Sequence, residues 1–194
     1  AGYTYKGYHG TPRGGFTKFE THLPGMLEGI ESIFLSKDRE TASSYAYGGN
    51  RKIYGLYAKI EKPLIVDCGA MPANNISLNT YPKRDLKELV NKYVGDAWNH
   101  IKTTINSAST DQIGYAALRS GKYDGVIFKT VKDAYNSNSY TDVYEVFTSE
   151  QVKSSDPVTY DDDGNVIPLS ERFTPGNSDI RYSERDSEGN VLSK

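Results

Sequence analysis

The fold of this chain is most constrained by two short segments. Each of them ends a predicted strand and carries residues that can contact a ligand. The segment YHGT (residues 8–11) follows alternating aromatic residues, a pattern that predicts a strand ending with an imidazole. Gly10 has no Cβ, so the backbone there can approach another group closely. The segment IFLS (residues 33–36) predicts a second strand, followed by a helix that begins at Ser36.

Phe34 and Tyr45 stand eleven residues apart, one on the predicted strand and one on the predicted helix. Two aromatic rings on adjacent elements can hold a flat heteroaromatic ring between them. Either ring could instead pack in the core, which is the commoner place for such residues. Their order behind the YHGT segment favours a nucleotide pocket.

Composition limits the possible classes of protein. The chain has 194 residues, enough for one ordinary domain, and its 23 basic and 25 acidic residues nearly cancel. We therefore expect no nucleic-acid-binding surface of the basic-patch kind. Cys68 is the single cysteine, which excludes an intrachain disulfide, and no apolar run reaches the ~20 residues of a membrane span. The abrupt Ala-Gly start, without a signal-peptide pattern, suggests a piece of a longer chain.

The remaining patterns predict an α+β fold. Strands are expected at residues 52–60, 64–67 and 123–128, and a late strand begins at Asp142. An apolar stripe predicts a long helix over residues 80–106. A second helix is expected from Ser109, whose spacing to Gln112 fits a capping box, to about Gly121.

The composition changes near residue 154. Residues 155–194 are rich in Asp, Ser, Gly, Pro and Asn, so we predict a domain over residues 1–154 followed by a polar C-terminal tail or linker, which could dock on the domain. Because the tail has few apolar residues, its removal is expected to leave a folded domain.

The YHGT segment and the eleven-residue spacing resemble the ADP-ribosyltransferase superfamily, in its His-Tyr-Glu branch with diphtheria-toxin-like and poly(ADP-ribose)-polymerase-like members. The tail, including GNSDIRYS, resembles segments that follow such domains in large polyvalent proteins of bacterial mobile elements and phages. The resemblance implies a split, twisted, mostly antiparallel β core with flanking helices. It also implies NAD as co-substrate, no metal, and a toxin-like transferase of the glycosyltransferase class.

The resemblance also implies roles for individual residues. His9 would bind the adenosine-side ribose, and the Gly10 backbone would hold the nicotinamide amide. Phe34 and Tyr45 would stack on the nicotinamide ring. Thr11 and Ser36 complete the two motifs, and Arg13 is suited to the pyrophosphate. In the polymerase branch the residue three before the Tyr is often a Ser that contacts the nicotinamide amide. Here that residue is Ala42, whose side chain cannot make this contact.

The catalytic carboxylate is expected on the late strand, DVYEVFTSEQVK. When the family's pattern is aligned on the Gln-aliphatic-Lys segment that follows, Val143 falls at the family's Glu position, with Asp142 beside it. A shift of two residues keeps the strand face and offers Glu145. We therefore predict Glu145 as the acid, with Asp142 as the alternative.

The activity that the resemblance implies is mono-ADP-ribosyl transfer from NAD, with release of nicotinamide, to an acceptor that could be protein, nucleic acid or a small molecule. The sequence leaves open a catalytically silent NAD-binding or interaction module and an NAD glycohydrolase. No membrane association is expected. The expected location is the cytoplasm, or a target cell into which the protein is delivered.

Overall fold

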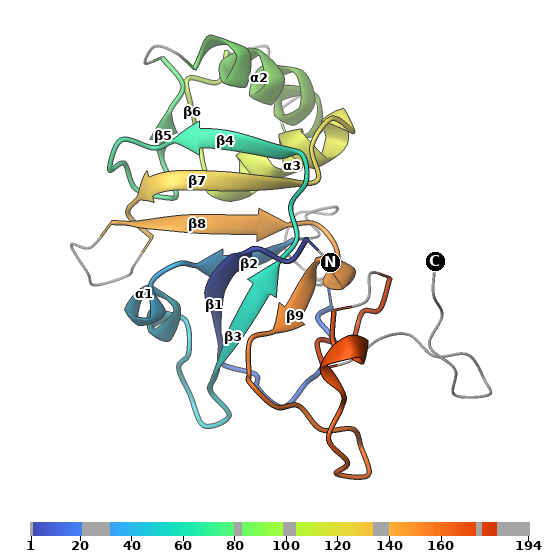
Figure 1. Cartoon of the computed structure of the whole chain (residues 1–194). Helices are drawn as coiled ribbons and strands as arrows, with labels where there is room; N and C mark the ends of the chain where they lie inside the picture. The colour runs from blue at the N-terminus through green and yellow to red at the C-terminus, as the bar shows by residue number, and fades with distance from the viewer. Residues whose placement is uncertain are drawn as a thin grey trace.

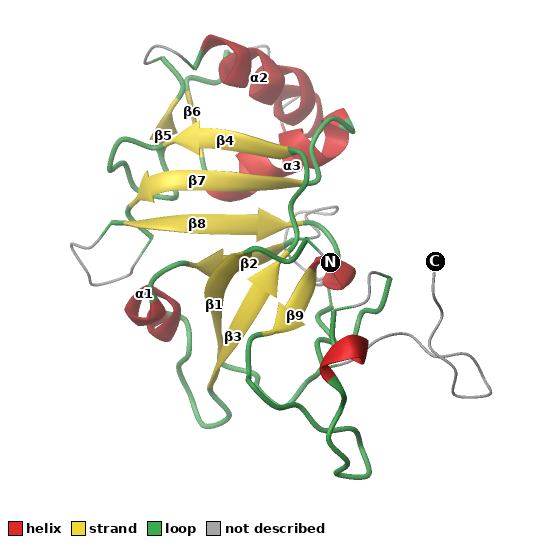
Figure 2. Cartoon of the chain, viewed as in Figure 1, coloured by secondary structure: helices red, strands yellow, loops and turns green. Residues whose placement is uncertain are grey.

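One seven-stranded sheet organises the chain. The computed structural model describes residues 2–20, 32–79, 83–98, 104–133, 140–173 and 176–181 (Figures 1 and 2). The strands of the sheet are β1 (Tyr5–Thr11), β2 (Ile33–Ser36), β3 (Lys52–Ala58), β4 (Pro63–Asp67), β7 (Gly125–Val131), β8 (Thr141–Val146) and β9 (Val152–Ser154). A separate short pair joins β5 (Ile76–Ser77) to β6 (Ser107–Ala108).

The large sheet has the order β4-β7-β8-β2-β1-β3-β9, and all its pairs are antiparallel except β4 with β7. In Figure 1, β4, β7 and β8 run across the molecule, whereas β1, β3 and β9 run steeply to them. The sheet is therefore strongly twisted into two groups of strands. This confirms the predicted α+β fold with a twisted, mostly antiparallel core.

The first helix begins later than the sequence suggested. Ser36 is the last residue of β2, and α1 spans Arg39–Ser44. Asp38 is its N-cap, because the Oδ2 atom accepts a hydrogen bond of 2.8 Å from the Thr41 N–H. The Ser36 hydroxyl instead accepts from the Asp38 N–H at 3.1 Å. The prediction of a helix start at Ser36 was wrong, because the aspartate two residues later satisfies the first free N–H groups.

Two longer helices pack together behind β4, β7 and β8 (Figure 2). The helix α2 spans Arg84–Trp98, within the predicted 80–106, and residues 99–103 lie outside the described part. The helix α3 spans Thr110–Ser120, with the predicted capping box of Ser109 and Gln112. It ends at Gly121, whose φ of 65° is the left-handed conformation that glycine adopts most easily.

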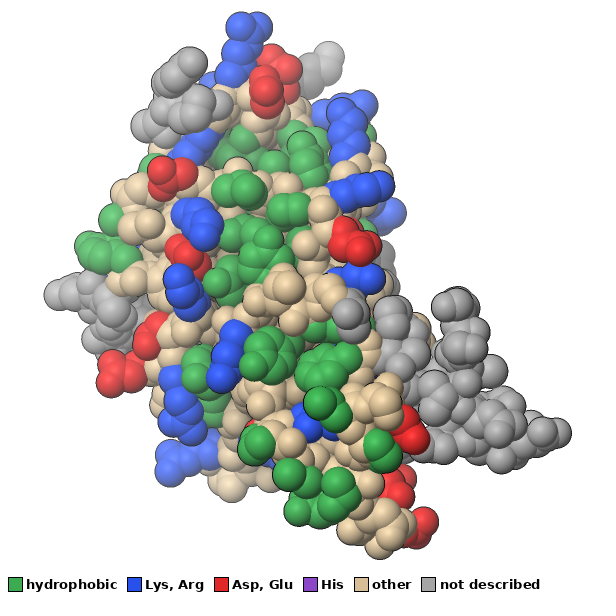
Figure 3. Space-filling view, viewed as in Figure 1, with side chains coloured by type: hydrophobic (Ala, Val, Ile, Leu, Met, Phe, Trp, Pro, Cys, Tyr) green, Lys and Arg blue, Asp and Glu red, His purple; other side chains and the backbone are tan. Residues whose placement is uncertain are grey.

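The two faces of the sheet bury two hydrophobic clusters. One lies between the strands and the helices α2 and α3, and includes Phe128 and Val143. The other covers the opposite face and includes Leu35, Leu56 and Tyr144. On that opposite face, Figure 3 shows hydrophobic side chains gathered across the middle, with basic side chains on both sides of them.

Part of the predicted tail packs against β9. Ile180 is buried, and its carbonyl accepts a hydrogen bond of 2.8 Å from the Ser154 N–H. Lys153 is fully buried, and its Nζ donates to the carbonyls of Asn177 and Asp179 at 2.8 and 3.0 Å. Burial lowers the pKa of Lys153 to about 8. Residues 177–180 therefore supply both apolar area and hydrogen-bond acceptors next to β9.

This packing predicts that truncation after Ser155 lowers the melting temperature, contrary to the expectation from tail composition. Losing Ile180 and the two acceptors of Lys153 removes on the order of 2–5 kcal/mol, which corresponds to a shift of about 5–15 °C for a domain of this size. Differential scanning calorimetry measures the shift. A chain ending after Arg181 is the matched control and is expected to melt as the full chain does. Equal melting of all three chains would show that the docked segment adds nothing to stability.

Candidate active site

A cavity of about 380 Å³ lies where the strand ends of the sheet meet α1 and α3. This volume is within the range of small-molecule sites in proteins. The residues from β1, β2 and the α1 region that line it are Tyr8, His9, Gly10, Phe34, Ser36, Ala42 and Tyr45. The residues from the other side of the fold are Ala73, Asn74, Thr110, Asp111 and Asp133. The cavity thus collects most of the residues predicted to bind NAD.

Gly10 is where β1 and α1 come closest. A Cβ at this position would overlap the backbone carbonyl of Ala42, so only glycine allows the contact. The sequence indicated a close backbone approach at Gly10, and the group that approaches is α1. The contact holds the α1 region, and with it Tyr45, against the end of β1.

The imidazole of His9 is fixed in one orientation. Its Nδ1 lies 2.9 Å from the Phe34 carbonyl oxygen, and its ring meets Phe19 edge-on with ring centres 5.0 Å apart. Burial lowers the pKa of His9, which favours the neutral ring. Because a carbonyl can only accept, Nδ1 carries the proton and Nε2 keeps a free lone pair. The side chain can therefore accept a hydrogen bond from a ligand hydroxyl.

The two predicted stacking residues both line the cavity. Phe34 is partly buried on β2, and Tyr45 is 39% exposed at the C-cap of α1. The Tyr45 hydroxyl lies 2.8 Å from the backbone carbonyl oxygen and 2.9 Å from the carboxylate of Asp133, and its single proton serves one of them at a time. This contact ties the end of α1 to the segment after β7.

Two of the predicted NAD contacts lie outside the cavity lining. Arg13 is exposed beyond the end of β1, and its N–H donates to the Thr11 hydroxyl at 3.1 Å. Thr11 ends β1. Ser36, by contrast, is a lining residue. Roles for Thr11 and Arg13 toward NAD therefore stay predictions.

Glu145 is fully buried on β8. It pairs with Phe34 across the strands, so the two side chains lie next to each other on one sheet face. A side chain at Gly114 of α3 would overlap its carboxyl group, and neither carboxyl oxygen has a hydrogen-bond partner among the described residues. Burial raises the pKa of Glu145 well above its ordinary value; the nearby Ser32 hydroxyl opposes the rise and the charge of Asp111 adds to it. Glu145 is not among the residues that line the cavity.

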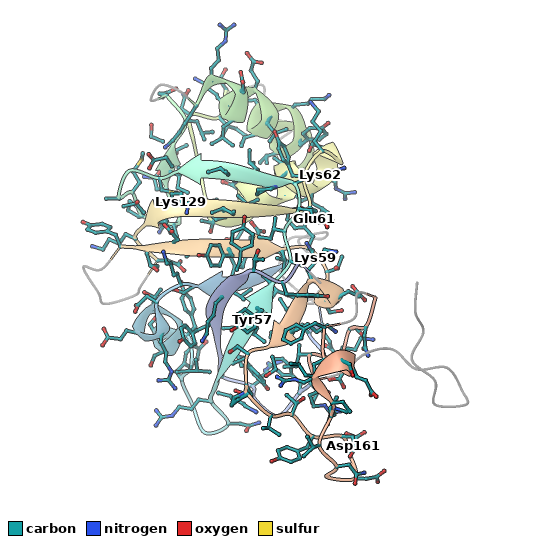
Figure 4. The ribbon with its side chains drawn as sticks, viewed as in Figure 1. Tyr57, Lys59, Glu61, Lys62, Lys129 and Asp161 are labelled. Atoms are coloured by element: carbon teal, nitrogen blue, oxygen red, sulfur yellow. The ribbon has the colours of Figure 1, made fainter. Side chains whose placement is uncertain are left out.

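Asp142 lies on the other face of β8 in an ion pair. Its carboxylate is 3.0 Å from the Nζ of Lys129, labelled in Figure 4, and 3.7 Å from that of Lys37. The carboxylate also accepts from the Thr130 N–H at 3.2 Å. Burial alone would raise the pKa of Asp142, but these contacts with Lys129 and Thr130 hold it below its ordinary value. Val143, between the two predicted acids, is only 1% exposed and belongs to the core.

Sequence reasoning missed the two carboxylates that do line the cavity, Asp111 and Asp133. Asp111 was read only as part of a helix start, and Asp133 follows β7 in a segment without a recognised motif. A signal was present, because both acids follow positions where an element begins or ends, and such termini gather at the edges of a sheet. Nothing in the sequence showed that the two would face the same space.

The buried carboxyl of Glu145 predicts a pH-dependent effect of Glu145→Gln. Since the folded-state pKa is raised, the native chain holds this proton longer than the unfolded chain. Native stability therefore falls as pH rises above the ordinary value of 4.5, by up to about 1.4 kcal/mol per pH unit until the folded-state pKa is passed. Glutamine removes this loss, so the variant is expected to gain on the parent between pH 5 and pH 8 in urea unfolding.

Glu88→Gln, on the exposed side of α2, is the control and is expected to show no such trend. A stability difference between Glu145→Gln and the parent that stays constant across this pH range would contradict the buried position of the carboxyl group.

Within the described residues, no group of three or more His, Cys, Asp or Glu side chains is placed to hold a metal ion. The helices among them are too short or too polar to cross a membrane.

Comparison with known proteins identifies the family of the chain. A family model described as ADP-Ribosyltransferase in polyvalent proteins matches residues 1–159, which contain all the cavity-lining residues. No curated protein and no solved structure matches significantly. The match agrees with the twisted, mostly antiparallel sheet. The chain therefore belongs to the ADP-ribosyltransferase family found in polyvalent proteins.

Proposed function

We propose that this domain transfers a single ADP-ribose unit from NAD to an acceptor and releases nicotinamide. The observation that carries the proposal is the convergence of His9, Gly10, Phe34 and Tyr45 on one cavity in a chain of this family. These four residues come from three separate elements, and the cavity suits a ligand the size of nicotinamide with its ribose.

The aromatic pair would orient the reacting bond. Phe34 and Tyr45 offer two ring faces to the nicotinamide, which fixes the direction of the bond between nicotinamide and ribose relative to an incoming acceptor. The nicotinamide leaves as a neutral molecule because it begins as a pyridinium, so no metal is needed to activate it.

His9 would act by positioning. With its proton held on Nδ1 by the Phe34 carbonyl, its Nε2 lone pair can accept a hydrogen bond from a ribose hydroxyl. The lowered pKa keeps this acceptor unprotonated at neutral pH. The protein thus offers the ribose a fixed acceptor before NAD arrives.

Breaking the bond develops positive charge on the ribose, which a carboxylate stabilises. Glu145 and Asp142 stay our predictions for this acid from the sequence. For Glu145 to act, its carboxyl must reach the cavity past Phe34 and Gly114. For Asp142, the side chain must leave Lys129 and reach the other sheet face.

One observation favours a second candidate function, a catalytically silent NAD-binding module. In the register set by the Gln-aliphatic-Lys segment, the family's Glu position on β8 would be Val143, which is buried in the core. A chain that kept the aromatic pair and lost the acid would bind NAD without cleaving it. In either case we propose that the domain works within a longer chain of a bacterial mobile element or phage, either in the cytoplasm or after delivery into a target cell.

Incubation with NAD labelled in its adenylate part, with and without bacterial lysate, tests the proposal. Transfer of label to macromolecules together with free nicotinamide is the expected result. Nicotinamide release without transfer to any macromolecule indicates hydrolysis or a small-molecule acceptor, and chromatography of the labelled product distinguishes the two. Binding of NAD without any release supports the silent module.

Tyr45→Ala is expected to weaken NAD binding by on the order of 1–3 kcal/mol, because one stacking face and its buried area are lost. Isothermal titration calorimetry measures the change. Tyr47→Ala is the matched control, since Tyr47 is 68% exposed and does not line the cavity. Equal affinities for Tyr45→Ala, Tyr47→Ala and the parent would remove Tyr45 from the binding site.

A further inference from the structure

The two carboxylates that line the cavity come from segments held together by backbone hydrogen bonds. The Thr110 N–H donates to the Ala73 carbonyl at 2.8 Å, and the Ala73 N–H donates to the Lys132 carbonyl at 3.0 Å. Asp111 follows Thr110, and Asp133 follows Lys132. Both acids are therefore placed by one rigid hydrogen-bonded corner.

Asp111 is the second residue of α3, and the capping box of Ser109 and Gln112 fixes the start of that helix. Among the described residues its carboxylate makes no ion pair. Burial raises the pKa of Asp111, which reflects a carboxylate partly removed from water without a compensating cation. A cationic ligand would supply the missing partner.

Asp133 faces the same space and interacts with Asp111. Burial, the largest cause, raises the pKa of Asp133 to about 6; the Tyr45 hydroxyl lowers it, and the charge of Asp111 raises it again. Because the charge of Asp111 raises the pKa of Asp133, the two carboxylates are close enough to repel, and a positive charge near both relieves the repulsion. The contact with Tyr45 places this negative charge at the edge of the proposed stacking position.

Within the part of the chain that the structure describes, the cavity lining contains no Lys or Arg to offset the two acids, and the lowered pKa of His9 makes that ring a neutral neighbour. A third acid, Glu145, is fully buried next to Phe34 with no hydrogen-bond partner among the described residues, and the Asp111 charge acts on it. The described lining, with Asp111 and Asp133 and no basic side chain, repels phosphate groups and attracts a flat cation. The oxidised nicotinamide ring is a flat cation, whereas the reduced ring carries no charge.

We propose that Asp111 and Asp133 recognise the positive charge of the oxidised nicotinamide ring, so that the cavity selects NAD⁺ over NADH. This inference rests on the proposed function, since it assumes that the cavity receives the nicotinamide end of the cofactor. Asp111 supplies a negative charge that forms no ion pair among the described residues. Asp133 supplies a second charge and positions the Tyr45 ring.

Calorimetric titration of the full chain with NAD⁺ and with NADH tests the inference without needing catalysis. We expect NAD⁺ to bind about 10-fold more tightly than NADH, the size of effect that a partly solvated charge pair gives. Asp111→Asn and Asp133→Asn remove one charge each and preserve shape, and the amide oxygen that Asp133→Asn introduces would still accept from the Tyr45 hydroxyl. Each substitution is expected to reduce the preference to about 3-fold, and the double substitution to abolish it.

Asp163→Asn is the control for the change in net charge. Asp163 lies in the loop of Asp161, at the lower end of the molecule in Figure 4, and does not line the cavity. It is expected to leave the preference at the parental value, and circular dichroism checks that every variant is folded.

Three results would overturn the inference. The first is equal binding of NAD⁺ and NADH by the parent, and the second is a full preference kept by folded Asp111→Asn and Asp133→Asn. Either result would mean that the carboxylates do not recognise the charge of the ring, while NAD binding and the proposed function still stand. If the parent binds neither form, the proposed function itself fails, and this inference fails with it.

Discussion

The hydrogen bond from Tyr45 to Asp133 joins the two groups of elements that enclose the cavity. Tyr45 ends α1, which the Gly10 contact holds against β1, whereas Asp133 follows β7 on the other side of the twisted sheet. The two residues are 88 positions apart in sequence. This contact restricts the rotamers of the Tyr45 ring, which is partly exposed. The position of the aromatic ring of Tyr45 and the position of the Asp133 carboxylate therefore depend on one another.

The site concentrates groups that a stability-driven fold would avoid. Glu145 is buried with no hydrogen-bond partner in the described part of the chain. Asp111 and Asp133 are half-buried carboxylates, and the charge of Asp111 raises the pKa of Asp133. Unsatisfied buried acids lower stability, and they gather where a protein binds or transforms a ligand. Among the described residues, the acids that form ion pairs, such as Asp142 with Lys129, do not line the cavity. The contrast between these two sets of carboxylates marks the site independently of any motif.

Local patterns in the sequence predicted most of the fold. The alternation in β3 and the capping box and glycine end of α3 each depend on residues close together in the chain, and the structure confirms them. The helix start at Ser36 failed because two residues could cap the same helix, and Asp38 does so. The composition left docking of the tail open, but it did not single out Ile180, because isolated buried residues in a polar tail leave no periodic signal.

The candidate site was predictable only in part, for the same reason. His9, Gly10, Phe34 and Tyr45 were found because their order and spacing resemble a family. Asp111 and Asp133 reach the cavity through the pairing of Ala73 with residues far along the chain, which sequence alone does not specify. The burial of Glu145 depends on the absence of a side chain at Gly114, on a helix distant in sequence.

The central claim is that nicotinamide lies between Phe34 and Tyr45, and nuclear Overhauser contacts between bound NAD and the protein test it most directly. The account predicts contacts from the nicotinamide ring protons to the rings of both Phe34 and Tyr45, and contacts from the adjoining ribose to residues around the same cavity. Contacts of the nicotinamide protons with residues outside the cavity, or with neither ring, would contradict it.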